Sequence, residues 1–492
     1  MKRRIVAIAC IGVLGACATA PAPKQDLSKI EHVVVIYAEN RSFDNLYGLF
    51  PGANGIANAT PEQYTQVDRD GKVLATLPPV WKSGTSEPDP AFPKDLPNKP
   101  FRIDAPPINL PMSVATRDLV HEFWRNQEQI NGGRLDRYVA ASDAGGLAMG
   151  YYDGSSLPLW KWAREYTLAD NFFMAAFGGS YLNHFWLICA CTPIDAKAPA
   201  NLRPQLDDRG WLKTRPNSPA SVLQGAPQFF GGEVTSDGYS VNTTQPPYQP
   251  SRVPPAKGGD PRLTDPARHT LPPQTQPTIG DTLSAKGVSW AWYAGEWKTG
   301  LADGMQSPEL PRTKINTGAN GAPYFVTHHQ PFNYFARFAP GTKDRDTHLK
   351  DYADMVAAID SGTLPAVAFY KPTGILNQHP GYANVTAGDA HIAELLERIR
   401  KSPLWSSTVV IVTYDENGGF WDHVAPPKGD RWGPGTRIPA IVVSPFAKKG
   451  YVDHTSYDTT SILKFITLRY GLAPLPGVRA GAGDLTNALD VR

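Results

Sequence analysis

The chain has 492 residues, of which 41% are hydrophobic, and this is enough to bury a large core. Its 48 Lys and Arg residues nearly balance its 46 Asp and Glu residues, which leaves a formal net charge of +2. A balance this close to neutral gives no electrostatic reason for binding nucleic acid or an anionic membrane surface. We therefore expect no nucleic-acid partner.

The first residues are typical of an export signal. Basic residues at 2–4 precede an apolar stretch, 5–13, that is too short to span a bilayer as a stable helix. The next segment, 14–17 (LGAC), resembles the lipobox of bacterial lipoproteins and predicts a signal peptide of residues 1–16 with a lipid anchor on Cys17. We expect an exported protein, either an outer-membrane lipoprotein or a periplasmic or secreted one. An ordinary signal peptide cleaved near Ala18 is the alternative.

Four cysteines are present, and Cys10 and Cys17 belong to the signal region. Cys189 and Cys191 then remain, and their single intervening residue makes a disulfide between them strained. We therefore expect the protein to fold without a disulfide framework and to rely on the size of its core.

In chain order, a short linker at 17–29 leads into one domain at 30–492. Residues 32–37 are expected to form a buried strand, and 159–166 a helix. The segments 51–110 and 200–280 are rich in Pro and Gly, with ten prolines between positions 241 and 280. Such segments cannot be sustained helices or central strands, so we interpret both as long surface excursions of the same domain.

The second half of the chain alternates between strands and helices. Strands are predicted at 288–293, 366–370, 408–413 and 438–443, and helices at 348–359, 391–401 and 455–470. Thr455-x-x-Asp458 fits a capping box at the start of the last helix. Strands without polar alternation, separated by helices, predict an α/β fold with a mostly parallel central sheet and helices on both faces. Sites in such sheets form beyond the carboxyl ends of the strands.

Two of the predicted strands end in acidic residues. Glu39 follows the first strand, and Asp415 and Glu416 follow the strand 408–413. If these strands are parallel neighbours, the three carboxylates converge, and they repel one another unless a cation or a proton neutralises them. A divalent metal ion with oxygen ligands fits this arrangement, although its identity stays open. The alternative is that each acid caps the turn or helix that follows it.

The string GGSYLNH at 178–184 contains a candidate nucleophile, Ser180. The two glycines let the backbone approach a ligand closely, and a helix that begins near Tyr181 would point its N–H groups at an anion. A serine in that place can be activated by metal coordination. The alternative is a plain turn in which Ser180 is the N-cap of the helix.

Several of the 11 histidines lie in predicted loops: His121, His328, His329, His379 and His423. Near a metal and a serine, such a set could hold a phosphoryl group and protonate a leaving oxygen. The sequence has no H-E-x-x-H helix, no G-x-S-x-G elbow and no Walker loop. Cys191-Thr192-Pro193 begins like the sulfatase motif C-x-P-x-R, but Asp195 stands at the arginine position and excludes that motif.

Together these segments resemble the bacterial phosphoesterase family of secreted acid phosphatases and phosphatidylcholine-type phospholipases C, within the alkaline-phosphatase-like superfamily. The matching strings include IEHVVVIYAENRSFD at 30–44, MGYYDGSSLP at 149–158, GGSYLNH at 178–184, HHQPFNYF at 328–335, TYDENGGFWDHVAPP at 413–427 and RIPAIVVSPFAKKGYVDHTSYDTTSILKF at 437–465. They follow one another in family order over nearly the whole chain.

The resemblance implies an alkaline-phosphatase-like α/β fold and hydrolysis of phosphoric esters through a phosphoserine at Ser180. It implies one divalent metal ion, with these ligands: Glu39, Asn40, Ser180, Asp415 and Glu416. It also implies a phosphate pocket formed by Asn40, His121, His329 and His379, of which His329 and His379 are the candidate catalytic histidines. His328 and His423 are expected to be supporting neighbours, with Asp422 orienting one of them.

Within that family we expect an acid phosphatase acting on phosphorylated small molecules. The chain ends at Arg492, soon after the last predicted helix, which leaves no room for the C-terminal β-domains that many of the phospholipases carry. A phospholipase C acting on phosphatidylcholine-like headgroups is the nearest alternative. A non-catalytic lipoprotein that binds a phosphorylated ligand is an alternative from another class.

Overall fold

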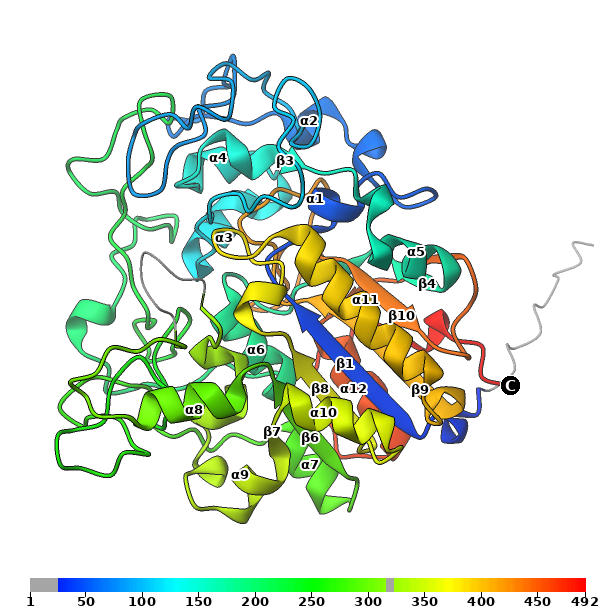
Figure 1. The fold of residues 1–492 in the computed structure, drawn as a ribbon. Coiled ribbons are helices and arrows are strands. Elements are labelled where there is room, and N and C mark those ends of the chain that lie inside the picture. Colours follow the sequence, from blue (N-terminus) through cyan, green and yellow to red (C-terminus); the bar gives the residue numbers. More distant parts are fainter. Residues whose placement is uncertain (1–24, 316–322) are drawn as a thin grey trace, which may run out of the picture.

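The computed structural model describes residues 25–315 and 323–492, so the expected signal peptide, the lipobox and most of the linker lie outside the described residues. An eight-stranded sheet crosses the centre of the molecule (Figure 1), in the order β11-β4-β10-β9-β1-β8-β6-β7. The strands, in that order, are Tyr451–Asp453, Thr167–Ala169, Ala440–Val443, Thr408–Tyr414, His32–Ala38, Val367–Lys371, Trp290–Ala294 and Leu349–Asp351.

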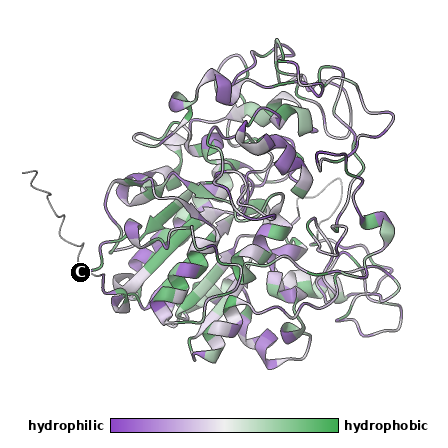
Figure 2. Cartoon of the chain, turned by 180° about the vertical axis from the view of Figure 1, so that it is seen from behind, coloured by the Kyte–Doolittle hydropathy of each residue, from purple (hydrophilic) through white to green (hydrophobic). Residues whose placement is uncertain are grey.

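All neighbouring strands of this sheet are parallel except the two pairs that β10 makes with β9 and β4. Every residue of β9, β8, β6 and β10 is buried. Continuous apolar runs such as TVVIVTY predict strands that are covered on both faces, and here they are. The strands are mostly green when coloured by hydropathy (Figure 2).

Helices cover both faces of the sheet. In front of it in Figure 1 lie α5 (Pro158–Glu165), α10 (Tyr352–Asp360) and α11 (Val385–Lys401), and behind it lie α6 (Ser180–Cys189) and α12 (Thr460–Tyr470). The helix α7 (Ile279–Ala285) packs against α6 and β6. The predicted α/β class, with a mostly parallel sheet between helices, is confirmed.

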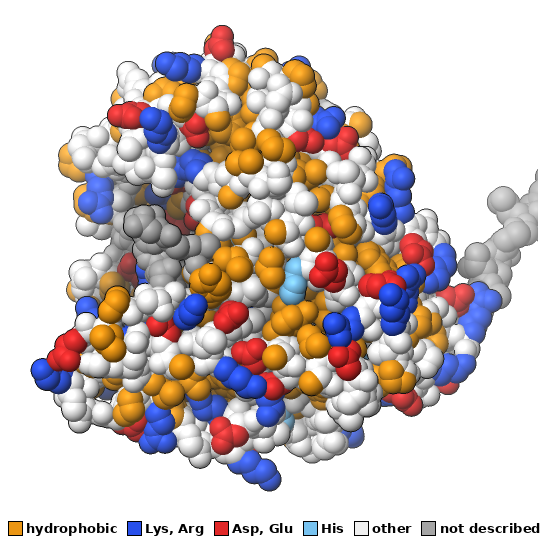
Figure 3. All heavy atoms as spheres, in the orientation of Figure 1, with side chains coloured by type: hydrophobic (Ala, Val, Ile, Leu, Met, Phe, Trp, Pro, Cys, Tyr) orange, Lys and Arg blue, Asp and Glu red, His pale blue; other side chains and the backbone are white. Residues whose placement is uncertain are grey.

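The remaining elements are short and lie around this core: α1 (Phe43–Tyr47), α2 (Pro61–Tyr64), α3 (Phe123–Ile130), α4 (Tyr138–Ala141), α8 (Trp297–Met305), α9 (Lys343–His348), and the strand pairs β2 (Phe101–Arg102) with β3 (Gly150–Tyr151) and β5 (Phe172–Phe173) with β12 (Tyr457–Asp458). The segments 51–110 and 200–280 are irregular over most of their length, as predicted. On the face drawn in Figure 3, basic and acidic side chains are interspersed. Among the described residues, no helix combines the length and apolar character needed to cross a membrane.

Three predicted helix starts are wrong. The helix predicted from 391 begins at Val385. The last helix begins at Thr460 instead of 455, because residues 457–458 pair with β5 as the strand β12. The predicted capping box is therefore absent, and the carboxylate of Asp458 accepts a hydrogen bond from the N–H of Thr460. The helix predicted from 348 begins at Tyr352, after β7, and Asp351 is its N-cap.

The disulfide between Cys189 and Cys191, which their spacing argued against, is present, but it spans a single intervening residue and forms no framework across the fold. Cys189 is the last residue of α6, and Ala190 after it adopts the left-handed conformation (φ 46°, ψ 42°). This turn reverses the chain and brings the two Cα atoms to 5.1 Å, within the range that a disulfide spans. The spacing alone did not reveal the left-handed residue.

A buried charge network fixes the turn that follows β1. The Arg437 guanidinium is fully buried and donates to Asp422 Oδ1 at 2.9 Å and to Asp44 Oδ1 at 3.1 Å. The other oxygen of Asp44 accepts from His423 Nδ1 at 2.6 Å. The backbone carbonyl of Arg437 accepts from the N–H of Phe43 at 3.0 Å. The network therefore ties the turn after β1 to the loop after β9 and to the approach to β10.

Arg437→Met should destabilise the protein by about 3–5 kcal/mol, because it leaves two buried carboxylates without their cation. Thermal or denaturant unfolding measures this effect. The matched control is Arg398→Met, which removes an exposed ion pair with Asp360 and should cost about 1 kcal/mol or less. Equal losses in the two variants would contradict the role assigned to Arg437.

Candidate active site

The parallel pairing of β1 with β9 brings the acidic residues together. Ala38, the last residue of β1, pairs with Tyr414, the last residue of β9, so the residues that follow leave the sheet side by side. The N–H of Asp415 donates to the carbonyl of Ala38 at 3.1 Å. Asp415 Oδ1 accepts from the N–H of Asn40 at 3.0 Å and from that of Glu416 at 2.8 Å. Glu39, Asp415 and Glu416 therefore lie close together, as the sequence predicted.

A lysine that sequence reasoning missed lies between two of these carboxylates. Lys371 ends β8, the other neighbour of β1, and its side chain is fully buried. Its Nζ lies 2.6 Å from Glu39 Oε1 and 3.5 Å from Asp415 Oδ2. Lys371 could have been placed near the acids from the sequence, because it directly follows the predicted strand 366–370. The carboxyl ends of adjacent parallel strands lie at one edge of the sheet.

The ionisation of the three acids reflects this unequal pairing. Burial opposes the charge on Glu39, but Lys371 and His329 outweigh it and hold the pKa of Glu39 well below its usual value. Burial and the neighbouring charge of Glu39 raise the pKa of Asp415 to about 7. Burial also raises the pKa of Glu416 well above its usual value. One lysine therefore does not neutralise the whole cluster.

These residues fit a divalent cation. Glu39 Oε2 is buried without a hydrogen bond, whereas Glu39 Oε1 lies 2.6 Å from both Lys371 Nζ and His329 Nε2. Glu39 and Asp415 also group with His184, with one ligand atom from each within 4.8 Å of the others. Buried carboxylate oxygens and imidazole nitrogens this close together are a donor set that divalent metals take.

Ser180 is the first residue of α6, and Gly179 is the N-cap. The alternative in which Ser180 caps the helix is therefore excluded. Its Oγ donates to Asn40 Oδ1 at 3.2 Å and lies 3.5 Å from Glu416 Oε1. Asn40 reaches this position through a left-handed backbone (φ 57°), which asparagine tolerates better than most residues. The serine hydroxyl thus lies beside two of the expected metal ligands.

His121 lies against the same group. Its Nδ1 contacts the carbonyl of Leu119 at 2.5 Å, and its Nε2 lies 3.4 Å from Asn40 Nδ2 and 3.7 Å from Glu416 Oε1. Burial alone would lower the pKa of His121, but Glu416 and Asp118 raise it to about 10. The close approach needs Gly179, because a Cβ there would lie 2.6 Å from the His121 carbonyl oxygen.

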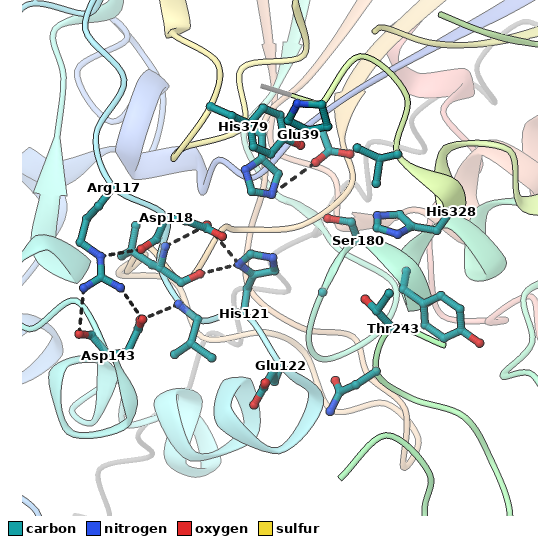
Figure 4. A pocket seen from close by; sticks show the side chains of 18 of the residues that line it. Glu39, Arg117, Asp118, His121, Glu122, Asp143, Ser180, Thr243, His328 and His379 are labelled. Atoms are coloured by element: carbon teal, nitrogen blue, oxygen red, sulfur yellow. Dashed lines mark hydrogen bonds and ion pairs between the residues drawn. The ribbon is translucent and has the colours of Figure 1, made fainter. Parts of the chain in front are cut away.

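Ser180, His121, His328 and His379 line one cavity of about 540 Å³ (Figure 4). The His379 ring stacks on Tyr382 at 4.3 Å, and its Nδ1 contacts the Pro380 carbonyl at 2.5 Å. Its Nε2 therefore faces the cavity, 3.7 Å from Glu39 Oε2. Burial lowers the pKa of His379 and, more strongly, that of His328.

His328 and His329 lie the opposite way round from the expectation, in which His329 formed the phosphate pocket and His328 supported it. His328 lines the cavity, whereas His329 lies behind the wall with its Nε2 on Glu39. Burial lowers the pKa of His329 to about 4. Its ring stacks on His184, a further buried histidine that the sequence analysis did not single out. In this geometry His329 contacts a carboxylate of the cluster instead of the space where a phosphate would lie.

The role expected for Asp422 needs a correction. His423 is held by Asp44, whereas Asp422 accepts from Arg437 and from the N–H of Asp44. Asp44 could not be singled out from the sequence because it lies in the first turn of the short helix α1, where an acidic residue is commonly found for its interaction with the helix dipole. His423 belongs to the network that supports the turn and does not line the cavity.

Residues 30–473 match the model of the Phosphoesterase family. Phospholipase C B of Mycobacterium tuberculosis is 25% identical over 94% of this chain and 78% of its own length. Non-hemolytic phospholipase C of Burkholderia pseudomallei is 26% identical over 94% of this chain and 59% of its own. A solved protein of the alkaline phosphatase superfamily from Vibrio parahaemolyticus aligns with 78% of this chain and 75% of its own chain, at 10% identity and with a TM-score of 0.33.

Asp415→Asn and Glu416→Gln should each lower bound metal and activity together, by about tenfold or more, because each removes a charged ligand candidate. Elemental analysis of purified protein, beside phosphate release, measures both. Asp389→Asn is the control, since Asp389 is an equally buried carboxyl that accepts from the N–H of Leu159 outside the cluster. Full metal content in the Asp415→Asn protein would contradict the assignment of Asp415 as a metal ligand.

Proposed function

The chain belongs to the Phosphoesterase family and is a phosphoric ester hydrolase, and from this premise we propose that it is an acid phosphatase that cleaves phosphomonoesters through Ser180. The observation that carries the proposal is the position of the Ser180 Oγ. It lines the cavity at the first residue of α6, beside Asn40 and Glu416. A hydroxyl placed in this way can act as a nucleophile.

One divalent ion, held by Glu39, Asn40, Asp415, Glu416 and Ser180, belongs to the proposal. Lys371 and the cationic His121 offset part of the charge of the three ionised carboxylates, and a divalent ion would offset the negative charge that remains. When bound, such an ion would lower the pKa of the Ser180 hydroxyl and offset charge that develops on the phosphoryl oxygens. Its identity is open, because carboxylate and amide oxygens suit several metals.

Ser180 attacks phosphorus in line with the leaving oxygen. The bond from its Oγ to phosphorus forms as the bond from phosphorus to the alcohol oxygen breaks, and the hydroxyl proton passes to Glu416. Asn40 and the cationic His121 bind the equatorial oxygens. Water then attacks the phosphoserine, phosphate leaves, and Ser180 regains a proton.

His379 is the best placed general acid for the leaving alcohol. Because its Nδ1 is held by the Pro380 carbonyl, its Nε2 carries a proton only when the ring is cationic. Burial lowers the pKa of His379, so the cation is present at low pH and is lost as the pH rises through that lowered value. This sign favours activity at acidic pH. His329, in contact with Glu39, holds that carboxylate in place.

Ser180→Ala should lose turnover of an aryl phosphate by about 10³-fold or more, because the first step then has no attacking atom. The melting temperature should change little, since only a hydroxyl is lost. Ser444→Ala is the control, because Ser444 is buried and bonded to the Thr408 carbonyl at the opposite end of β9. A fully active Ser180→Ala enzyme would refute the mechanism.

A second candidate function is a phospholipase C acting on choline-type headgroups. It is favoured by the names of the relatives and by two carboxylates that line the cavity, Glu122 and Glu233. Burial raises the pKa of Glu233, which is about half-buried. A cationic headgroup beside these two acids would gain favourable charge interactions.

Comparing an aryl phosphate with a phosphatidylcholine dispersion separates the two functions, and we expect faster turnover of the aryl phosphate. The double variant Glu122→Gln/Glu233→Gln should leave the aryl phosphate reaction within about twofold. If the headgroup binds at these acids, the same variant slows phosphatidylcholine hydrolysis by about tenfold, equivalent to ~1.4 kcal/mol. Preferential hydrolysis of phosphatidylcholine by the unmodified enzyme would overturn the phosphatase proposal.

A further inference from the structure

Arg41 is a fully buried arginine that takes no direct part in the proposed hydrolysis. Its side chain is 1% exposed, and it does not line the cavity. Among the residues that the structure describes, no carboxylate forms an ion pair with its guanidinium, which packs over the Phe420 ring at 5.4 Å. A buried charge without an ion pair is costly, so its hydrogen bonds must be specific and numerous.

Those hydrogen bonds converge on the residue before His379. Arg41 Nη2 donates to the Gln378 carbonyl at 2.7 Å and Nε donates to the same oxygen at 3.2 Å, while Nη1 donates to Asn45 Oδ1 at 3.3 Å. Two donors in the fixed fork of a guanidinium define the direction of that carbonyl, which a lysine cannot do. Arg41 therefore sets the orientation of the peptide that leads into His379.

The peptide needs such a restraint because its backbone is strained. Gln378 has a positive φ of 75°, which costs energy for a residue with a side chain. Its side chain is held as well, since Gln378 Oε1 accepts from the Tyr414 hydroxyl at 2.6 Å. A further hydrogen bond joins the residues before and after Gln378: Asn377 Oδ1 accepts from the N–H of His379 at 2.9 Å.

Arg41 also belongs to the turn that carries the carboxylates. Its N–H donates to the carbonyl of Glu416 at 3.0 Å, and the N–H of Glu39 donates to the carbonyl of Asn377 at 3.0 Å. The turn after β1 and the segment 377–379 are thus bonded to each other at two successive points. A shift of one segment would therefore break or strain its bonds to the other.

We propose that Arg41 is a positioning residue that holds His379 in register with Ser180 and the carboxylate cluster. It touches neither substrate nor cavity and acts through the Gln378 carbonyl. The inference rests on the proposed role of His379 as general acid. Loss of the restraint should let the strained peptide relax and move the His379 ring, and small displacements of a catalytic group cost up to about 10²-fold in rate.

A double-mutant cycle tests this inference, with Arg41→Met, His379→Ala and the combined variant assayed on two substrates. A nitrophenyl phosphate has a good leaving group, whereas an alkyl phosphate needs protonation of its leaving oxygen. Arg41→Met should slow the alkyl phosphate by about 10- to 100-fold and the nitrophenyl phosphate much less. The combined variant should be no slower than His379→Ala alone, because both changes remove the same contribution.

Arg345→Met is the matched control. Arg345 is buried and donates to the Phe338 and Gln249 carbonyls and to Asn333 Oδ1, which is the same kind of bonding away from the cavity. It should lower the melting temperature without changing the ratio between the two substrates. If Arg41→Met does not fold, Arg41→Lys takes its place in the cycle, since it keeps the buried charge but loses the fork that fixes the direction of the Gln378 carbonyl.

The outcomes separate the inference from the proposed function. If His379→Ala leaves the alkyl phosphate reaction unchanged, the general-acid role fails and the inference fails with it. If His379→Ala is slow but the losses of the two single variants multiply in the combined one, Arg41 acts independently of His379, and only the inference is overturned. An Arg41→Met variant that is slow on the alkyl phosphate, together with a combined variant as active as His379→Ala, supports both, whereas a fully active Arg41→Met variant overturns the inference.

Discussion

Three buried carboxylates at the ends of two adjacent strands impose the constraint on which the rest of the site depends. Glu39, Asp415 and Glu416 are each at most 1% exposed. The parallel register of β1 and β9 leaves Glu39 and Asp415 no freedom to separate, because the strands end in the paired residues Ala38 and Tyr414. Carboxylates that water cannot solvate must be met by a cation, a hydrogen bond or a proton. The surrounding residues supply a cation and hydrogen bonds.

Compensation comes from each side of the cluster. The third strand contributes Lys371, and the turns contribute backbone N–H groups that reach Asp415 and Glu416. The Glu416 contact needs a sharp turn, in which Gly418 has a φ of 62° and lies so close to Asn40 that a Cβ would be 2.4 Å from its carbonyl oxygen. In the proposed function, the charge that these groups leave uncompensated would attract a divalent ion.

The parts of this arrangement that follow from strand register could be read from the sequence, and the parts that follow from loop conformation could not. Uninterrupted apolar runs identified β1 and β9, and the acids after them could then be placed at one edge. No local pattern showed that Ala190 turns left-handed and lets Cys189 meet Cys191. Nor could periodicity decide which of His328 and His329 faces the cavity, because adjacent residues of a short 3-10 turn point in different directions set by tertiary packing.

This division also indicates where substrate preference can change. The carboxylates at the strand ends are mutually dependent, since removing one charge unbalances the others in a site with little access to water. The cavity rim is built differently: Glu122 and Glu233 come from irregular or helix-terminal segments, and Glu122 is substantially exposed. A charge there can be exchanged at little cost in stability. Proteins that share the strand-end cluster can therefore differ in leaving group through the rim alone, while the phosphoryl-transfer machinery stays the same.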